Sequence, residues 1–138
     1  MAFQQTLEVH THGKGLYDLT PAAQAAIQAA NIREGFCLLY LPHTSASLMI
    51  NENYDPTVKQ DLVEFMARLV PEGLAWYRHT IEGKDDSPAH QLAALLPVNL
   101  TIPVENRRLG LGQWQGIFLV EHRQAQHRRT VDLRVFAG

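Results

Sequence analysis

The chain has a single cysteine, no long apolar run and no excess of positive charge, and each absence excludes a class of protein. Cys37 has no partner for an intrachain disulfide, which suits a reducing compartment. No stretch approaches the roughly 20 apolar residues of a membrane-spanning helix. The N-terminal residues also lack the apolar core of a secretory signal. We therefore expect a cytoplasmic protein with no membrane partner.

The charge balance argues against a general nucleic-acid partner. The chain has 12 lysines and arginines and 14 aspartates and glutamates, so its net charge is -2 at pH 7. It has no broad positive field, and Arg123, Arg128 and Arg129 form only a local basic patch. Gly-x-Ser-x-Gly elbows and P-loops are absent too, which weakens the case for those hydrolases and nucleotide enzymes. We expect neither a nucleic-acid partner nor an organic cofactor.

The residues that are present suffice for one domain with its own core. The chain has 138 residues, of which 46% are hydrophobic and 19% charged, as in soluble globular proteins. A chain of this length can bury a core without a disulfide or a structural metal. No repeat, linker or low-complexity segment interrupts the sequence, so we expect a single domain over residues 1–138.

Apolar periodicity, prolines and glycines divide the chain into expected strands and helices. Alternating or continuous apolar runs predict strands at residues 3–9, 16–19, 36–41, 45–50, 99–104, 114–121 and 130–136. Helices are predicted where a capping residue precedes a proline, at Thr20-Pro21, at Asp55-Pro56 and just before Pro88.

The order of these elements predicts the α+β class with mostly antiparallel pairing. Strands and helices do not alternate strictly, as they would in a parallel sheet. We expect residues 16–19 to return beside the first strand, and residues 114–121 and 130–136 to form a final hairpin. Cys37 lies within an apolar strand and is interpreted as a buried, inert thiol.

The first polar cluster begins at His43, directly after the apolar strand that ends near Pro42. An imidazole can exchange a proton near neutral pH and is the commonest metal ligand. The hydroxyls of Thr44 and Ser45 could hold a phosphate or a carboxylate. The alternative is a histidine that serves only the strand connection.

The second half of this cluster precedes the helix that Asp55 caps. Glu52 is a candidate general base, and Asn51 and Asn53 are candidate substrate-binding residues. A solvated turn explains the two asparagines equally well.

The next cluster contains His79, Asp85, Asp86 and His90. His90 is expected in the first helical turn, where free N–H groups and the helix dipole favour anions. His79 and His90 would add two nitrogen donors to His43, enough for a zinc-like site with an open position. Asp85 and Asp86 are candidate substrate- or magnesium-binding residues, and the alternative is that they cap the helix.

The last cluster places Trp114 and Gln115 among three glycines. Trp114 could form the wall of a pocket and Gln115 could hydrogen-bond a ligand, whereas a core tryptophan beside a bulge is the alternative. Glu121 is a possible further acid. His122 and His127 flank a charged turn and are interpreted as surface residues.

Taken in order, these residues resemble the YjbQ-type family. The resemblance covers nearly the whole chain and is carried by residues 42–46, 51–55, 86–90 and 112–115. It implies a compact α+β domain of two packed sheets that assembles as a homotrimer. It also implies a pocket near the subunit boundaries, with the family's histidines at His43, His79 and His90. Metal has been associated with this pocket in some relatives.

Three residues depart from the family's usual pattern. Gln113 stands where threonine is usual, Arg107 where a turn glycine is usual, and Asn99 where serine is common. These departures affect the fine contacts to a ligand more than the fold.

The resemblance further implies a weak, secondary thiamine-phosphate synthase activity. That reaction joins a pyrimidine pyrophosphate to a thiazole phosphate and releases pyrophosphate. His43, Glu52 and His90 would be the catalytic residues, with a zinc-like ion at the histidines or Mg²⁺ bound with the phosphorylated substrate. The alternative is a non-catalytic trimer that uses the same residues to bind a metal or an anion.

Overall fold

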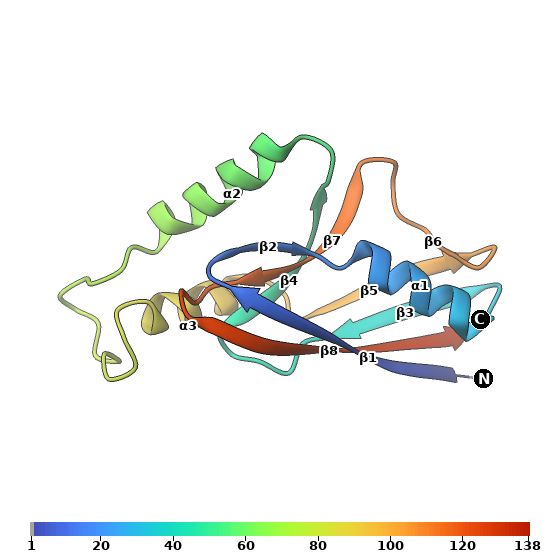
Figure 1. The fold of residues 1–138 in the computed structure, drawn as a ribbon, viewed down its shortest axis with the longest axis horizontal. Coiled ribbons are helices and arrows are strands. Elements are labelled where there is room, and N and C mark those ends of the chain that lie inside the picture. Colours follow the sequence, from blue (N-terminus) through green and yellow to red (C-terminus); the bar gives the residue numbers. More distant parts are fainter. Residues whose placement is uncertain (1) are drawn as a thin grey trace.

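The computed structural model describes residues 2–138, in which three helices and eight strands alternate irregularly (Figure 1). Their order is β1 (Ala2–His12), β2 (Gly15–Asp18), α1 (Thr20–Ala30), β3 (Gly35–Tyr40), β4 (Ala46–Glu52), α2 (Pro56–Leu69), α3 (Asp86–Leu95), β5 (Asn99–Glu105), β6 (Arg108–Leu109), β7 (Gln115–Glu121) and β8 (Gln126–Ala137). Across the described residues, no helix has the length and apolarity needed to cross a membrane.

The strands form two antiparallel sheets, which confirms the expected α+β class. The larger sheet has the order β1-β8-β3-β5-β6, and the smaller has the order β2-β7-β4. Helix α1 contacts strands of both sheets, α2 contacts β2, and α3 contacts β4. Figure 1 shows α2 standing apart from the larger sheet, and α3 at the end of the molecule away from the chain termini.

The expected final hairpin is wrong. β7 pairs with β2 and β4, whereas β8 pairs with β1 and β3. β7 is buried along almost its whole length, while β8 alternates between buried and accessible positions. The pairing places β7 and β8 in different sheets, where β7 is covered on both faces and β8 mainly on one. The expectation that β2 returns beside β1 is also wrong, because β2 pairs with β7 and β1 pairs with β8.

Two of the expected helix caps have different outcomes. Asp55 accepts a hydrogen bond from the Thr57 N–H at 3.0 Å and caps α2 as predicted. Thr20 is instead the first helical residue, and its hydroxyl accepts a hydrogen bond from the Ile117 N–H at 2.9 Å. Its oxygen therefore joins α1 to β7 rather than capping the helix.

The turn between β5 and β6 is consistent with the turn glycine that the family resemblance implies at position 107. Asn106 and Arg107 both have positive φ angles, of 51° and 61°. A two-residue hairpin turn with two such angles favours glycine at its second position. Here Gln28 offsets the strain, because its side-chain amide donates to the Arg107 carbonyl at 2.8 Å and its own carbonyl accepts from the Arg107 guanidinium.

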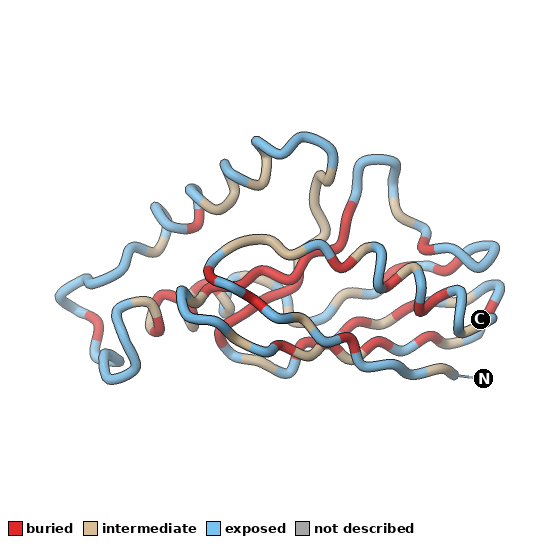
Figure 2. Tube along the Cα trace, viewed as in Figure 1, coloured by how far each residue is buried: buried red, intermediate tan, exposed pale blue. Residues whose placement is uncertain are grey.

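The main core lies between the sheets and under α1 (Figure 2). Cys37 is fully buried there, and burial raises the pKa of its thiol to about 12. The thiol therefore stays protonated at neutral pH, which confirms the interpretation of an inert, buried cysteine.

A buried ion pair joins the two sheets at the end near α3. Arg129 of β8 donates to both carboxylate oxygens of Glu121 in β7, at 2.8 and 2.5 Å. Glu121 also accepts from the Thr11 hydroxyl of β1 at 2.6 Å, and Arg129 donates to the Ser45 hydroxyl at 2.9 Å. Arg129 and Glu121 are 4% and 1% exposed, so water screens the pair very little.

We predict that Arg129→Met lowers the free energy of unfolding by about 3–5 kcal/mol, because it leaves the Glu121 carboxylate buried without its cation. Urea unfolding followed by circular dichroism measures this loss. Arg128→Met is the matched control, since Arg128 pairs with Glu8 at the surface. Loss of this exposed pair is expected to change the free energy of unfolding only slightly. Equal losses in the two variants would contradict a special role for the buried pair.

Candidate functional site

Two histidines and one aspartate converge at the start of α3. The Nε2 atom of His79 lies 2.5 Å, and that of His90 3.1 Å, from the same oxygen, Oδ2, of Asp86. One ligand atom from each residue lies within 4.8 Å of the others. Asp86 is buried, whereas both imidazoles are partly exposed, so a ligand can approach from the imidazole side.

Local structure explains this convergence. Asp86 and His90 are four residues apart on α3, a spacing that places both side chains on one face of a helix. His79 comes from the segment that connects α2 to α3. Gly83 turns that segment with a φ angle of 111°, in the region that favours glycine.

Further hydrogen bonds orient the cluster. Arg123 donates to the other Asp86 oxygen, Oδ1, at 2.6 Å and to Asp85 at 3.1 Å. The Nδ1 atom of His90 lies 2.7 Å from the Thr44 carbonyl oxygen. Because Arg123 occupies Oδ1, Oδ2 is the Asp86 oxygen that faces the two imidazoles.

The proton positions imply that the cluster attracts a cation. A carbonyl oxygen can only accept, so the His90 Nδ1 beside Thr44 must carry a proton. In a neutral His90, Nε2 would then direct a lone pair at the Asp86 carboxylate, which repels it. Either an imidazolium or a cation between Nε2 and Oδ2 removes this conflict.

Asp86 supplies the negative charge that a cation needs. Burial alone would raise the pKa of Asp86, but the hydrogen bond with His79 and the positive charges of His90 and Arg123 lower the pKa below its usual value. The carboxylate is therefore ionised at neutral pH and keeps Oδ2 available.

His43 lies outside this group, so the grouping observed within the chain differs from the predicted set of three histidines. Its Nε2 atom accepts a hydrogen bond from the Thr130 N–H at 3.0 Å, which directs this nitrogen toward β8. Burial lowers the pKa of His43, and the positive charge of Arg129 acts in the same direction. Asp86, and not His43, is the third residue of the group.

Five of the expected site residues lie at the far end of β4 or beside it: Asn51, Glu52, Asn53, Trp114 and Gln115. Its register with β7 pairs Ala46 with Glu121 and Glu52 with Gln115. The seven residues of β4, at about 3.3 Å each, separate these two ends by about 20 Å. Within one chain, Asn51, Asn53 and Trp114 therefore do not share a pocket with His90.

Most polar groups at that end are used for local structure. The Glu52 carboxylate accepts from the Tyr54 and Asp55 N–H groups, and the Asn53 amide donates to Asp18 at 3.1 Å. The Asn51 side chain accepts from the Glu52 N–H, and Gln115 accepts from the Gly112 N–H at 2.8 Å. These contacts fit the turn interpretation that the sequence left open for the asparagines.

Trp114 is not a core residue. Its side chain is 52% exposed and packs edge-on against Tyr54, with ring centroids 4.9 Å apart. Two exposed aromatic rings beside each other form an apolar surface that remains available for a ligand or a partner.

The interpretation of His122 as a surface residue is wrong. Its side chain is 3% exposed, and its Nε2 atom lies 2.9 Å from the buried Ser47 hydroxyl. Sequence reasoning missed this pair and also the role of Arg123, because both depend on contacts with distant segments. The one sequence signal is that His122 and Arg123 directly follow an apolar strand.

The fold and this cluster define an α+β protein of two antiparallel sheets with a His-Asp-His group at a helix start. The sequence model of the family described as UPF0047 protein YjbQ-like matches residues 5–138. The chain therefore belongs to the YjbQ-like family, which confirms the resemblance.

Named relatives agree with this assignment. The chain is 48% identical to the UPF0047 protein sll1880 of Synechocystis over 132 residues, which cover 96% of this chain and 90% of that protein. It is 40% identical to the UPF0047 protein YjbQ of Salmonella typhimurium over 89% of each chain.

Solved structures show the same fold. The conserved hypothetical protein TT1486 from Thermus thermophilus matches with a TM-score of 0.86 and 36% identity, over 96% of this chain and 99% of that one. A YbjQ-like protein of unknown function from Sulfolobus solfataricus matches over the full length of both chains with a TM-score of 0.87 and 21% identity.

We predict that His122 makes stability depend on pH. Burial lowers its pKa to about 4 from an ordinary value of 6.5, so only the unfolded chain takes up a proton as the pH falls through this range. The stabilisation that His122 contributes is complete above 6.5, its pKa in the unfolded chain. It is lost as the pH falls toward about 4, its pKa in the folded chain. It amounts to about 3 kcal/mol.

Urea unfolding between about pH 7 and pH 4 should show this loss in the wild type, with a smaller loss in His122→Leu. Comparing the two chains cancels the contribution of every other titrating group. Parallel pH profiles would mean that His122 is protonated equally in both states.

Proposed function

We propose that this protein is a metal-dependent enzyme that acts on a small phosphorylated metabolite. The single observation that carries the proposal is the convergence of His79 Nε2 and His90 Nε2 on one oxygen of Asp86. Two imidazoles and a carboxylate are a common donor set for zinc and other first-row divalent ions, and three protein ligands leave a position for substrate.

The surroundings of the three residues fit this role. The Thr44 carbonyl fixes the His90 proton on Nδ1 and so directs the lone pair of Nε2 toward the proposed ion. Arg123 orients the Asp86 carboxylate. A bound divalent ion would supply Lewis-acid polarisation of a phosphoryl oxygen.

A concave surface beside His79 supports a phosphorylated substrate. It has a volume of about 290 Å³ and is lined by Tyr77, His79, Thr80 and Lys84, among others. A lysine ammonium and a threonine hydroxyl are suitable donors to phosphate oxygens. Asp85 is a weaker choice for Mg²⁺, since one of its oxygens accepts from both Arg123 and the Gln124 N–H.

We further propose that the protein is a homotrimer in which subunits share the site. The exposed apolar side chains of Tyr54, Phe65, Leu69 and Trp114 are a suitable contact surface. A neighbouring subunit could bring its own Glu52 end close to His90, which one chain alone keeps at a distance. This arrangement would restore the pocket at subunit boundaries that the family resemblance implies.

Thiamine-phosphate synthesis is the specific reaction we propose, as a secondary activity. The pyrimidine pyrophosphate would lose its pyrophosphate as the thiazole nitrogen bonds to the pyrimidine methylene carbon. Lys84 and the proposed ion would stabilise the leaving pyrophosphate. A non-catalytic metal- or anion-binding trimer is the alternative, because the same cluster could hold an ion without turnover.

We predict that untagged protein, freed of metal by a chelator, binds Zn²⁺ in isothermal titration calorimetry. His79→Ala, His90→Ala and Asp86→Asn should each weaken binding by more than about tenfold, because each removes one donor. His127→Ala is the control, since its half-buried ring lies outside the cluster and its side-chain hydrogen bond is to the Ala125 carbonyl of its own turn. Loss of binding in His43→Ala with retention in Asp86→Asn would favour the three-histidine set instead.

Activity and subunit sharing are tested together by mixing two variants. We expect wild-type protein with metal to form thiamine phosphate slowly, and His90→Ala and Glu52→Ala to be inactive separately. If subunits share the site, unfolding and refolding the two variants together restores part of the activity, because some boundaries then combine intact Glu52 with intact His90.

Light scattering should give the mass of a trimer for each sample in that experiment. Metal binding without product formation by the wild type would favour the non-catalytic alternative. Activity in the wild type without restoration in the mixture would overturn the shared site.

A further inference from the structure

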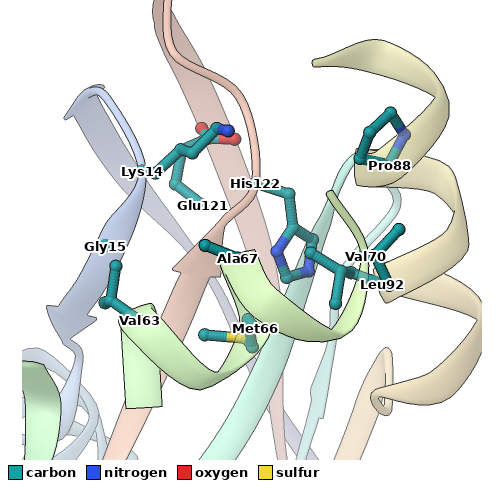
Figure 3. A pocket seen from close by; sticks show the side chains of 10 residues that line it. All are labelled: Lys14, Gly15, Val63, Met66, Ala67, Val70, Pro88, Leu92, Glu121 and His122. Carbon is teal, nitrogen blue, oxygen red and sulfur yellow. The ribbon is translucent and has the colours of Figure 1, made fainter. Parts of the chain in front are cut away.

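A second cavity lies between α2 and α3, away from the His-Asp-His cluster (Figure 3). It has a volume of about 50 Å³. Val63 and Met66 of α2 and Leu92 of α3 give it aliphatic walls, while Lys14 and His122 bring polar groups to it. On α3, Leu92 lies two residues beyond His90, a spacing that points the two side chains to different faces of the helix.

The His122 ring has one nitrogen without a hydrogen-bond partner. Nε2 lies 2.9 Å from the Ser47 hydroxyl, and among residues 2–138 Nδ1 has no partner. Every fully buried side-chain nitrogen and oxygen of the described residues does have a partner. Nδ1 must therefore be accessible to solvent. The His122 ring is nearly buried, and the accessible space that it lines is the cavity.

Ser47 decides which nitrogen of His122 carries the proton. Its hydroxyl is fully buried, and Nε2 of His122 is its one side-chain partner in the described part of the chain. A buried hydroxyl needs an acceptor for its proton, so Ser47 donates to Nε2. In the neutral ring the remaining proton is then on Nδ1, which offers an N–H donor to the cavity.

The charges around the cavity favour an acceptor. Burial keeps the pKa of His122 near 4, so the ring is neutral at pH 7, and the nearby positive charge of Lys14 also lowers that pKa. Both oxygens of Glu121 are already occupied, by Thr11, Arg129 and the Arg123 N–H. Lys14 is paired with Glu72 at the surface, which leaves its other ammonium protons free to donate.

We propose that this cavity binds a short-chain carboxylate. The carboxylate would accept hydrogen bonds from His122 Nδ1–H and from the Lys14 ammonium, while its alkyl part lies against Met66 and Leu92. At about 10–15 Å³ for each water-sized group, the cavity has room for about three to five such groups. Acetate and propionate have this size, whereas an aromatic ring or a phosphorylated metabolite does not fit.

The experiment is a titration of metal-free protein with propionate, followed by long-range ¹H–¹⁵N correlation spectra of the histidine rings. Before addition, the His122 signals should report a neutral ring with the proton on Nδ1. Propionate should shift the Nδ1 signal in a saturable manner. His122→Leu and Lys14→Met should each weaken binding, measured by calorimetry, by at least about tenfold, because each removes a donor to the anion.

Two further variants control for folding and charge. Val63→Phe keeps the His122–Ser47 pair and fills the cavity from a partly exposed helix position, so it should abolish binding while leaving the circular dichroism spectrum unchanged. Lys59→Met removes a lysine whose ammonium lies 4.9 Å from the Phe118 ring centroid, outside the cavity lining. It should bind propionate as the wild type does.

Several outcomes would overturn the proposal. One is equal binding of propionate and neutral 1-propanol, which would show that the cavity recognises only an apolar group. Another is binding that survives Val63→Phe but disappears in His90→Ala, which would locate the anion at the His-Asp-His cluster. A proton on Nε2 of His122, or no saturable shift, would remove the proposed donor or the site itself. Zinc binding is measured separately, so the two proposals can fail independently.

Discussion

The buried ion pair between Arg129 and Glu121 is the constraint on which the rest of this molecule depends. A buried charge is tolerated when its partner and its remaining hydrogen bonds are in place, and here Thr11 and Ser45 complete the set. The pair joins the two sheets at one end of the molecule. Glu121 also accepts from the Arg123 N–H, and the Arg123 side chain in turn holds Asp86. The geometry of the cluster is thus linked to the contact between the sheets.

The histidines at the α3 end of the molecule lie in two environments of opposite charge. Asp86 brings negative charge to His79 and His90, in a partly exposed setting that attracts a cation. His122 is buried beside Lys14 and Arg129, so it remains neutral and offers a hydrogen bond. The proposed cation and the proposed anion would therefore lie on different faces of α3 and would not compete for the same groups.

Local chemistry made much of the fold predictable. The Asp55 cap, the buried strand around Cys37 and the order of helices and strands follow from patterns within a few residues. The site was predictable in part: the start of α3 brings His90 and Asp86 together because four residues make about one helical turn. The place of His43 was not predictable, since its Nε2 accepts a hydrogen bond from Thr130, far away in the sequence.

Residue order and periodicity suffice to establish the α+β class, the ends of most elements and the pairing of Asp86 with His90 on one helix face. Strand partners and burial were decided by tertiary contacts, because two strands that are neighbours in sequence can bury different faces. β7 and β8 belong to different sheets for this reason, and His122, directly after β7, is carried beneath α2 instead of to the surface. Such contacts depend on how distant segments pack, and no local pattern contains that information.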